Sequence, residues 1–138
     1  MILDVMLDKD AYAPERAYKA DAGLDLRSPI FIKVKAGGAA VIDTGVHVDI
    51  PQGFVGMLKS KSGLNVKYSL QSEGVIDAGY TGSIVVKLYN HGKQDLMIEQ
   101  GDKISQLVIL PTPDVKIHVV NKLQGGERGN NGFGSTGR

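Results

Sequence analysis

The stretch IVVKL, residues 84–88, decides the fold class of this chain. Its side chains alternate, with Ile84, Val86 and Leu88 on one phase and Val85 and Lys87 on the other. A period of two places successive side chains on opposite faces of a β-strand, whereas a helix repeats its apolar positions about every 3.6 residues. The stretch therefore predicts a strand.

The same alternation recurs at residues 30–34, 46–50 and 115–119, and turn signals rich in glycine separate these segments. Short strands spaced by such turns predict an all-β sandwich or barrel. Residues 102–110, DKISQLVIL, form a nearly continuous apolar run that is typical of a strand buried on both faces. Only residues 62–70, SGLNVKYSL, favour a short helix.

Length and charge restrict the function. The chain has 138 residues, which fits one domain with a sizeable core. Its 16 basic and 15 acidic side chains nearly balance, so we expect binding neither of nucleic acid nor of membranes. Recognition of an anion must therefore be local.

The residue types that hold metals give a second restriction. Cysteine is absent, which excludes disulfides and thiolate metal sites and is typical of a reducing compartment. The three histidines, His47, His91 and His118, share no metal-ligand spacing, and we expect all three in solvent. The start MILDVMLDKD is too acidic for a signal peptide, so we expect a cytoplasmic protein, in the host cytoplasm if a phage encodes it.

The C-terminal stretch RGNNGFGSTG, residues 128–137, has two interpretations. A glycine-rich terminus is by default a flexible tail. However, its glycines let backbone N–H groups approach an anion, and Arg128 offers a guanidinium fork to phosphate. Ser135 and Thr136 add hydroxyl donors, and Phe133 adds an apolar plate. Both interpretations stay open for this stretch alone.

Three internal stretches carry side chains suited to a phosphorylated ligand. DAGLDL, 21–26, contains Asp25, and KSKSGLN, 59–65, is rich in lysine and serine donors. EGVIDAGYTG, 73–82, holds Asp77 and Tyr80 between glycines, where a carboxylate would activate water and a ring would pack on a sugar. Each stretch also fits an ordinary structural role, namely a turn aspartate, a polar turn or a hairpin loop.

Taken in order, these stretches resemble the five motifs of the trimeric dUTPase (dUTP diphosphatase) family. The motifs are AGLDL with Asp25, SGL with Ser62, GVIDAGYTG with Asp77 and Tyr80, GDKISQL with Gln106, and RGNNGFGSTG with Arg128 and Phe133. The resemblance covers residues 21–137. It implies a jelly-roll-like β-barrel (a β-clip) over residues 1–124, with a glycine-rich arm, 125–138, that closes over the active site of a neighbouring subunit in a homotrimer.

The resemblance further implies hydrolysis of dUTP to dUMP and pyrophosphate, which keeps uracil out of DNA and supplies dUMP for dTMP synthesis. Asp77 would activate the attacking water, while Asp25 would hold waters of a Mg²⁺ ion bound mainly by the triphosphate. Tyr80 would exclude ribonucleotides, and Phe133 would stack on uracil. The substrate-binding residues that the resemblance implies are Lys61, Ser62, Gly63, Gln71, Val75, Asp77, Tyr80, Lys87, Gln106, Arg128, Phe133, Gly134, Ser135 and Thr136.

Some positions depart from the family pattern and leave rival functions open. Lys61 stands where arginine is usual, and Gln71 stands where many members have asparagine. Lys87 occupies the place of the glutamate with which the related dCTP deaminases act on cytosine, so deamination is the weaker rival. A dUTP-sensing regulator with a protein partner and a structural jelly-roll subunit also stay open.

Overall fold

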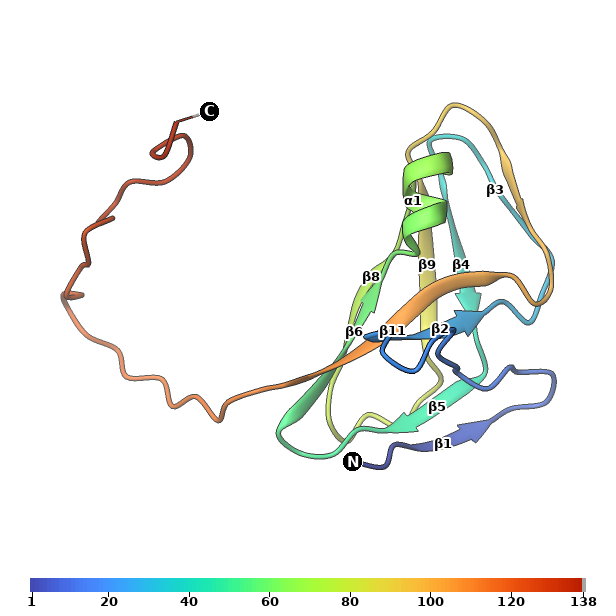
Figure 1. The fold of residues 1–138 in the computed structure, drawn as a ribbon, viewed down its shortest axis with the longest axis horizontal. Coiled ribbons are helices and arrows are strands. Elements are labelled where there is room, and N and C mark those ends of the chain that lie inside the picture. The colour runs from blue at the N-terminus through green and yellow to red at the C-terminus, as the bar shows by residue number, and fades with distance from the viewer. Residues whose placement is uncertain (138) are drawn as a thin grey trace.

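The structure, a computed structural model, describes residues 1–137 and consists almost entirely of antiparallel strands (Figure 1). In chain order, the elements are β1 (Asp4–Leu7), β2 (Gly23–Arg27), β3 (Ile32–Val34), β4 (Ala39–Asp43), β5 (Val46–Asp49), β6 (Phe54–Lys59), α1 (Ser62–Tyr68), β7 (Leu70–Gln71), β8 (Glu73–Ile76), β9 (Val85–Asn90), β10 (Leu96–Ile98) and β11 (Lys103–Pro111). The predicted all-β class is confirmed.

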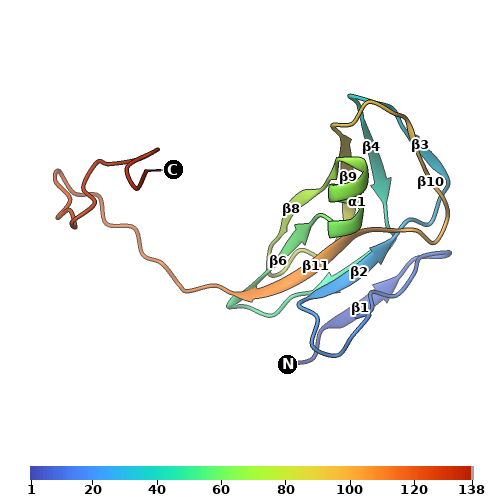
Figure 2. The same cartoon turned by 45° about the horizontal axis from the view of Figure 1, so that its top comes forward.

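Within residues 1–137 the strands pair in four small sheets around one core. The largest sheet has the order β2-β11-β6-β8, the next has the order β4-β9-β7, and β1-β5 and β10-β3 form two-stranded pairs. Figures 1 and 2 show β2 and β11 side by side on one wall of the barrel, with β4 and β9 on another. This arrangement is the predicted jelly-roll-like barrel.

The alternation that predicted the fold class is visible in β9. Val86 and Leu88 are buried, whereas Val85 and Lys87 are exposed. Burial of such aliphatic side chains stabilises each strand by about 1.5 to 3 kcal/mol per side chain. The core consists of Leu26, Val34, Ala40, Ile42, Val46, Val48, Ile50, Leu58, Leu70, Ile76, Ile84, Val86, Leu88, Ile98, Ile104 and Leu107.

The short helix expected in residues 62–70 is α1, which comes between β6 and β7 in the chain and is labelled in Figure 2. It ends at Ser69, whose φ of 55° is left-handed and whose N–H group donates to the carbonyl of Asn65. No helix in the part of the chain that the structure describes is both long and apolar enough to cross a membrane.

The strand β11 only partly matches its sequence prediction of burial on both faces. Ile104, Ser105 and Leu107 are buried, but Leu110 is 46% exposed. The physical reason is that β11 pairs with β2 only as far as Val108, has both β2 and β6 as neighbours only from Gln106 to Val108, and pairs with β6 alone beyond that. The apolar run therefore continues past the part of the strand that has neighbours on both sides.

The strand predicted at residues 115–119 is wrong for the single chain. No helix or strand is present between residue 112 and residue 137, and Val115, Ile117 and Val119 are 71%, 89% and 87% exposed. A strand needs a neighbour to complete its backbone hydrogen bonds, and this segment extends away from the barrel (Figure 1, orange to red). The last strand ends at Pro111; the domain boundary at residue 124 stays a prediction.

Candidate active site

The predicted site residues lie in three separate places of the single chain. One group lies where β2, β6 and β11 meet the start of α1. A second lies on β8, on β9 and in the loop between them, residues 77–84. The third lies in the C-terminal arm, away from the barrel (Figure 1).

Asp25 is the buried anion of the first group. It lies inside β2 with 3% of its surface exposed, so the interpretation as a turn aspartate is wrong. The ammonium group of Lys61 donates to its Oδ1 atom, and Nζ of Lys103 lies 2.7 Å from its Oδ2 atom. Burial acts to raise the pKa of Asp25, but the contacts with Lys103 and Lys61 outweigh it and hold that pKa below its ordinary value.

The surroundings of Asp25 fit a hydrated metal ion rather than a directly held one. Oδ2 of Asp25 is buried and has only the charge contact with Lys103, without a hydrogen bond of good geometry. Among residues 1–137, no group of three or more His, Cys, Asp or Glu side chains could hold a metal ion. A single carboxylate held by two ammonium groups fits contact with the water shell of a Mg²⁺ ion better than direct coordination of it.

Lys61 also forms the boundary at which α1 begins. It is the N-cap residue, with φ of −72° and ψ of 124°, and it makes no side-chain capping bond because an ammonium group has no acceptor; the group donates to Asp25 instead. Ser62 and Gly63 follow in the first turn. Gly63 is exposed and a Cβ there would meet no other atom within 4 Å, so this turn is open to a ligand beside the Lys61–Asp25 pair.

Two of the donors expected in residues 59–65 are already used inside the protein. The hydroxyl group of Ser60 donates to the carbonyl of Ser72 at 3.2 Å and accepts from its N–H group at 3.0 Å. The ammonium group of Lys59 pairs with Glu73 at 2.9 Å. These bonds join β6 to the segment at β7 and β8, so Ser60 and Lys59 are structural in this arrangement.

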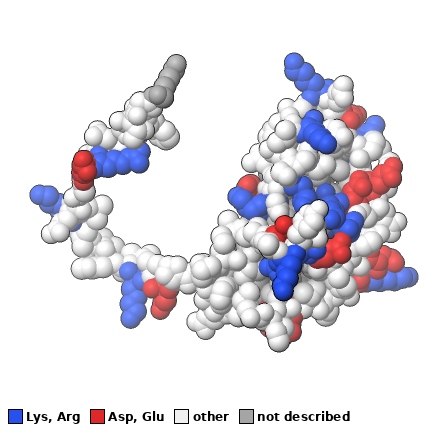
Figure 3. All heavy atoms as spheres, in the orientation of Figure 1, with Lys and Arg blue, Asp and Glu red and all other residues white. Residues whose placement is uncertain are grey.

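Gln106 lies beside Asp25 in the same group. The two residues are partners in the register of β11 and β2. Nε2 of Gln106 donates to the carbonyl of Ser60 at 3.0 Å. The register therefore places the two residues opposite each other on β11 and β2, and Figure 3 shows Lys, Arg, Asp and Glu atoms intermixed on the face of the barrel toward the viewer.

The second group surrounds Asp77 and Tyr80. The N–H group of Tyr80 donates to the carbonyl of Asp77 at 3.1 Å, in a turn that Gly79 permits with a φ of 83°. The hydroxyl group of Tyr80 donates to the carbonyl of Ser83 at 3.1 Å. A pocket of about 240 Å³ lies here, and its lining residues are Val75, Ile76, Asp77, Tyr80, Ser83 and Val85.

This pocket combines the features that water activation beside a sugar requires. Asp77 is an exposed carboxylate, and the Tyr80 ring is 46% exposed. Val75 and Val85 add apolar surface to the same pocket. A carboxylate next to apolar walls can accept a proton from a bound water and restrict where that water lies.

Gln71 and Lys87 lie on the exposed side of the sheet β4-β9-β7. Oε1 of Gln71 is 3.0 Å from Nε2 of His91, so the amide of Gln71 has an internal partner. Nζ of Lys87 lies 4.9 Å from the centre of the Tyr89 ring, at cation–π distance. Lys87 is therefore an exposed cation, and its position offers no carboxylate for deamination.

The third group stays within the arm. Nε of Arg128 donates to the carbonyl of Asn131 at 3.0 Å, and Phe133 is fully exposed. Gly134 has a left-handed φ of 76°, as the turn that it forms requires. A pocket of about 420 Å³ is lined by Glu127, Arg128, Asn131, Ser135 and Thr136 alone. The single chain thus does not bring the arm residues to Asp25 or Asp77.

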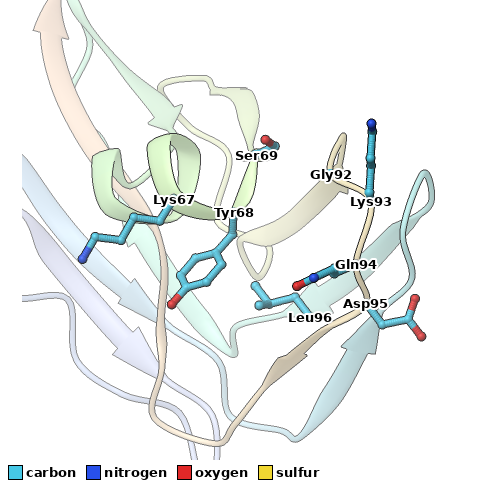
Figure 4. A pocket seen from close by; sticks show the side chains of 8 residues that line it. All are labelled: Lys67, Tyr68, Ser69, Gly92, Lys93, Gln94, Asp95 and Leu96. Carbon is cyan, nitrogen blue, oxygen red and sulfur yellow. The ribbon is translucent and has the colours of Figure 1, made fainter.

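A further pocket, of about 290 Å³, contains none of the predicted residues. Its lining residues are Lys67, Tyr68, Ser69, Gly92, Lys93, Gln94, Asp95 and Leu96. Figure 4 shows the Tyr68 ring beside Leu96, while Lys93 and Asp95 point away from the hollow. The pocket lacks the converging donors that a phosphate would need.

Sequence reasoning did not single out two residues that contact the site. Lys103, on β11, is the second cation at Asp25. His47 was expected in solvent, which is wrong, because its ring contacts the carbonyl of Thr81 and the carboxylate of Asp8. No local pattern signals either contact, since each joins residues that are distant in the sequence.

Comparison with known proteins shows to which family the chain is related. A family model described as dUTPase matches residues 9–137. The deoxyuridine 5'-triphosphate nucleotidohydrolase of Clostridium acetobutylicum is 43% identical over 134 residues, covering 95% of this chain and 92% of that protein. A solved structure of the Staphylococcus bacteriophage 80alpha dUTPase with dUPNHPP has a TM-score of 0.92 at 34% identity and covers 99% of each chain. A variant dUTPase from phage phi11 of S. aureus, described with a structural Mg(II) ion, has a TM-score of 0.82 at 33% identity and covers 88% of this chain and 98% of that one. The chain belongs to the dUTPase family.

Proposed function

We propose that this protein hydrolyses dUTP to dUMP and pyrophosphate by attack of a water molecule on the α-phosphorus. The observation that carries the proposal is the pocket that Asp77 and Tyr80 line together, in a chain of the dUTPase family. Asp77 accepts the proton of the attacking water, and the Tyr80 ring packs against the sugar. The product dUMP then serves dTMP synthesis, and removal of dUTP keeps uracil out of DNA.

The first group of residues binds the triphosphate. Lys61, Ser62 and Gln106 supply donors to phosphate oxygens, and Gly63 allows close approach of the backbone. Asp25 would accept hydrogen bonds from waters of a Mg²⁺ ion bound with the triphosphate. That ion, when bound, neutralises charge on the phosphates as the α-phosphorus is attacked.

The three groups of residues can form one site only if they come together from different subunits. In the single chain the arm residues Arg128 and Phe133 contact neither the Asp25 group nor the Asp77 pocket. We propose a homotrimer in which the arm of one subunit clamps the nucleotide held by another. Phe133 then stacks on uracil, while Arg128, Ser135 and Thr136 bind the γ-phosphate.

Product analysis tests the activity. We expect the intact protein to convert dUTP, and not dCTP, dTTP or UTP, into the monophosphate and pyrophosphate in Mg²⁺ buffer. Asp77→Asn should reduce the rate roughly 10²- to 10⁴-fold while leaving the fold intact. Asp95→Asn, at an exposed carboxylate away from the pocket, is the matched control. Pyrophosphate release by Asp77→Asn at the rate of the intact protein would contradict the role of Asp77.

Subunit complementation tests the shared site. A chain ending after Gly126 lacks the clamp, and the full-length Asp77→Asn variant lacks the base, so each should be inactive alone. Co-refolded mixtures should regain activity, because some sites then combine an intact Asp77 with an intact arm from another subunit. Mixtures as inactive as their components would show that each arm serves its own chain.

A regulatory role is the second candidate. The solved structure of the 80alpha phage dUTPase is described in connection with phage dUTPases that control the transfer of virulence genes. A dUTP-sensing role with a protein partner is therefore a proposal for this chain too. Binding of dUPNHPP without pyrophosphate release from dUTP would favour the regulator over the enzyme.

A further inference from the structure

A histidine outside the predicted site ties the loop of Asp77 and Tyr80 to another part of the barrel. His47 lies on β5, and its side chain is 17% exposed. Its Nδ1 atom is 2.8 Å from the carbonyl oxygen of Thr81, the residue that follows Tyr80. Its Nε2 atom is 3.2 Å from Oδ2 of Asp8.

The chemistry of these two contacts determines the protonation of the ring. The Thr81 carbonyl and the Asp8 carboxylate are both acceptors, so each ring nitrogen must donate. A neutral imidazole has a single N–H group, whereas an imidazolium has two. Only the protonated ring of His47 satisfies both partners at once.

The charged groups around the ring favour that protonated state. Asp8 faces it from the segment after β1, and Asp43 acts on it from the end of β4. The hydrogen bonds to Thr81 and Asp8 raise the pKa of His47 above its ordinary value, although partial burial acts in the opposite direction. Asp4 and Asp49 line the pocket of about 260 Å³ beside the ring.

Asp8 is itself fixed beside His47. Its N–H group donates to the carbonyl of Gly45 at 2.8 Å. Gly45 has a φ of 66°, and a Cβ placed there would lie 2.9 Å from that of Ala11 and 3.2 Å from that of Asp8. Glycine at this turn therefore permits the close approach that presents the Asp8 carboxylate to the ring.

The far half of the loop is secured without His47. The hydroxyl group of Thr44 donates to the carbonyl of Ile84 at 2.6 Å, and the N–H group of Ile84 donates to the carbonyl of Val46 at 2.8 Å. The hydroxyl group of Ser83 donates to the Asp43 carboxylate. His47 supplies the contact at Thr81, the position adjacent to Tyr80.

We propose that His47 is a positioning residue for dUTP hydrolysis, which holds the Tyr80 ring and the Asp77 carboxylate through its bond to the Thr81 carbonyl. This inference rests on the proposed function. When the imidazolium loses its proton, one of the two contacts is no longer made, and the near half of the loop is held less firmly. The orientation of the loop thereby depends on pH.

Two substitutions separate the effect of the hydrogen bond to Thr81 from the effect of protonation of the His47 ring. His47→Asn keeps an N–H donor near the position of Nδ1 and does not titrate, whereas His47→Phe keeps a ring without donors. We expect His47→Phe to lower kcat roughly 10-fold to 100-fold at low pH, and to lower the Tm there as well, because both hydrogen bonds of the imidazolium are lost. The ratio of the kcat/KM values of wild type and His47→Asn should fall as pH rises above the ordinary histidine value of 6.5 and through the raised pKa of His47.

A matched histidine controls for general effects of the substitution. His118 lies exposed in the segment that follows β11, so His118→Asn should give a ratio that does not change with pH. A ratio for His47→Asn that is equally flat would overturn the inference, as would wild-type kcat in His47→Phe. Failure of the wild-type protein to hydrolyse dUTP would instead remove the proposed function together with this inference.

The protonation of the ring has a readout that is independent of turnover. In the ¹⁵N NMR spectrum, both ring nitrogens of His47 should remain protonated above the ordinary histidine pKa of 6.5. Asp8→Asn should lower the transition of His47, whereas Asp49→Asn, on the same strand as His47, should leave it nearly unchanged. If Asp8→Asn left the pH of the His47 transition unchanged, the result would contradict the proposed hydrogen bond between His47 and Asp8.

Discussion

The side chain of Gln106 lies directly over the backbone of Gly23, where a Cβ on Gly23 would overlap the Gln106 amide. Gly23 begins β2, and Gln106 lies on the neighbouring strand β11. Because the glycine leaves this space open, the amide can reach the carbonyl of Ser60 on the far side of β11. The packing links two sequence motifs of the family at one point.

Gly23→Ala should displace that amide. Since the added methyl group overlaps Gln106, we expect a loss of about 1 to 3 kcal/mol in the free energy of unfolding. We also expect a higher KM for dUTP, because Gln106 would no longer face the phosphates. Urea unfolding and steady-state kinetics measure the two effects.

A double-mutant cycle shows whether the effect acts through Gln106. Gln106→Ala removes the amide atoms that a Cβ on Gly23 would overlap and leaves only its own Cβ at 3.0 Å, so Gly23→Ala should cost less stability in that background. Equal costs in both backgrounds would mean that other atoms of the sheet resist the methyl group.

Asp25→Asn should destabilise the protein in a pH-dependent way. The change leaves Lys61 and Lys103 without their shared carboxylate, at a cost of about 2 to 3 kcal/mol near neutral pH. The pKa of Asp25 lies below the ordinary aspartate value of 3.8, so its stabilising contribution is present above that pH and is lost as pH falls through the lower folded pKa. Urea unfolding should show the wild type and the variant converging in acid.

Asp95→Asn is the control for that experiment. Asp95 accepts a hydrogen bond from the N–H group of Ala36 and lies 3.5 Å from Lys33 at the surface, with its side chain 48% exposed. A pair exposed to this extent contributes little to stability, because water and salt screen it. A loss in Asp95→Asn as large as that in Asp25→Asn would argue against the burial of Asp25 as the cause.

Lys61→Met and Lys103→Met should separate stability from substrate binding. Each variant removes one of the two cations that contact Asp25, so both should lower stability. Only Lys61→Met should also raise the KM for dUTP by about 10-fold or more, because Lys61 adjoins Ser62 at the start of α1. Equal KM values for the two variants would mean that the phosphates of dUTP do not bind at Lys61.

Phe133→Ala should affect the substrate and not the fold. Phe133 is fully exposed in the single chain, so the Tm should not change. Stacking on a base is worth about 1 to 3 kcal/mol, which predicts a KM at least about 5-fold higher. An unchanged KM, measured by release of pyrophosphate, would mean that Phe133 does not reach uracil.

Much of the secondary structure is determined by residues that are close together in the sequence. The period of two in β9 and the helical character of residues 62–70 follow from neighbouring side chains, and the structure has a strand at β9 and a helix over Ser62–Tyr68. At residues 115–119 the same pattern misled, since alternation shows what a strand would look like and not whether a neighbour exists. Pairing is a property of the assembled sheet.

The candidate site also depends partly on local motifs and partly on the register between strands. The order of the motifs identified the family and placed Asp25, Asp77 and Gln106 among its residues. However, Gln106 faces Asp25 only because the register shifts between Lys103 and Ser105; without that bulge, Ser105 would be the partner of Asp25.

The sequence by itself determined the strand periodicity, the helix and the motifs, because these depend on residues close together in the chain. Only the tertiary structure decided that Lys103 reaches Asp25, that Ser60 binds Ser72 and that His47 reaches Thr81. The physical reason is that register, bulges and packing bring together atoms from distant segments. Such contacts are set by the free energy of the whole barrel and leave no local pattern in the chain.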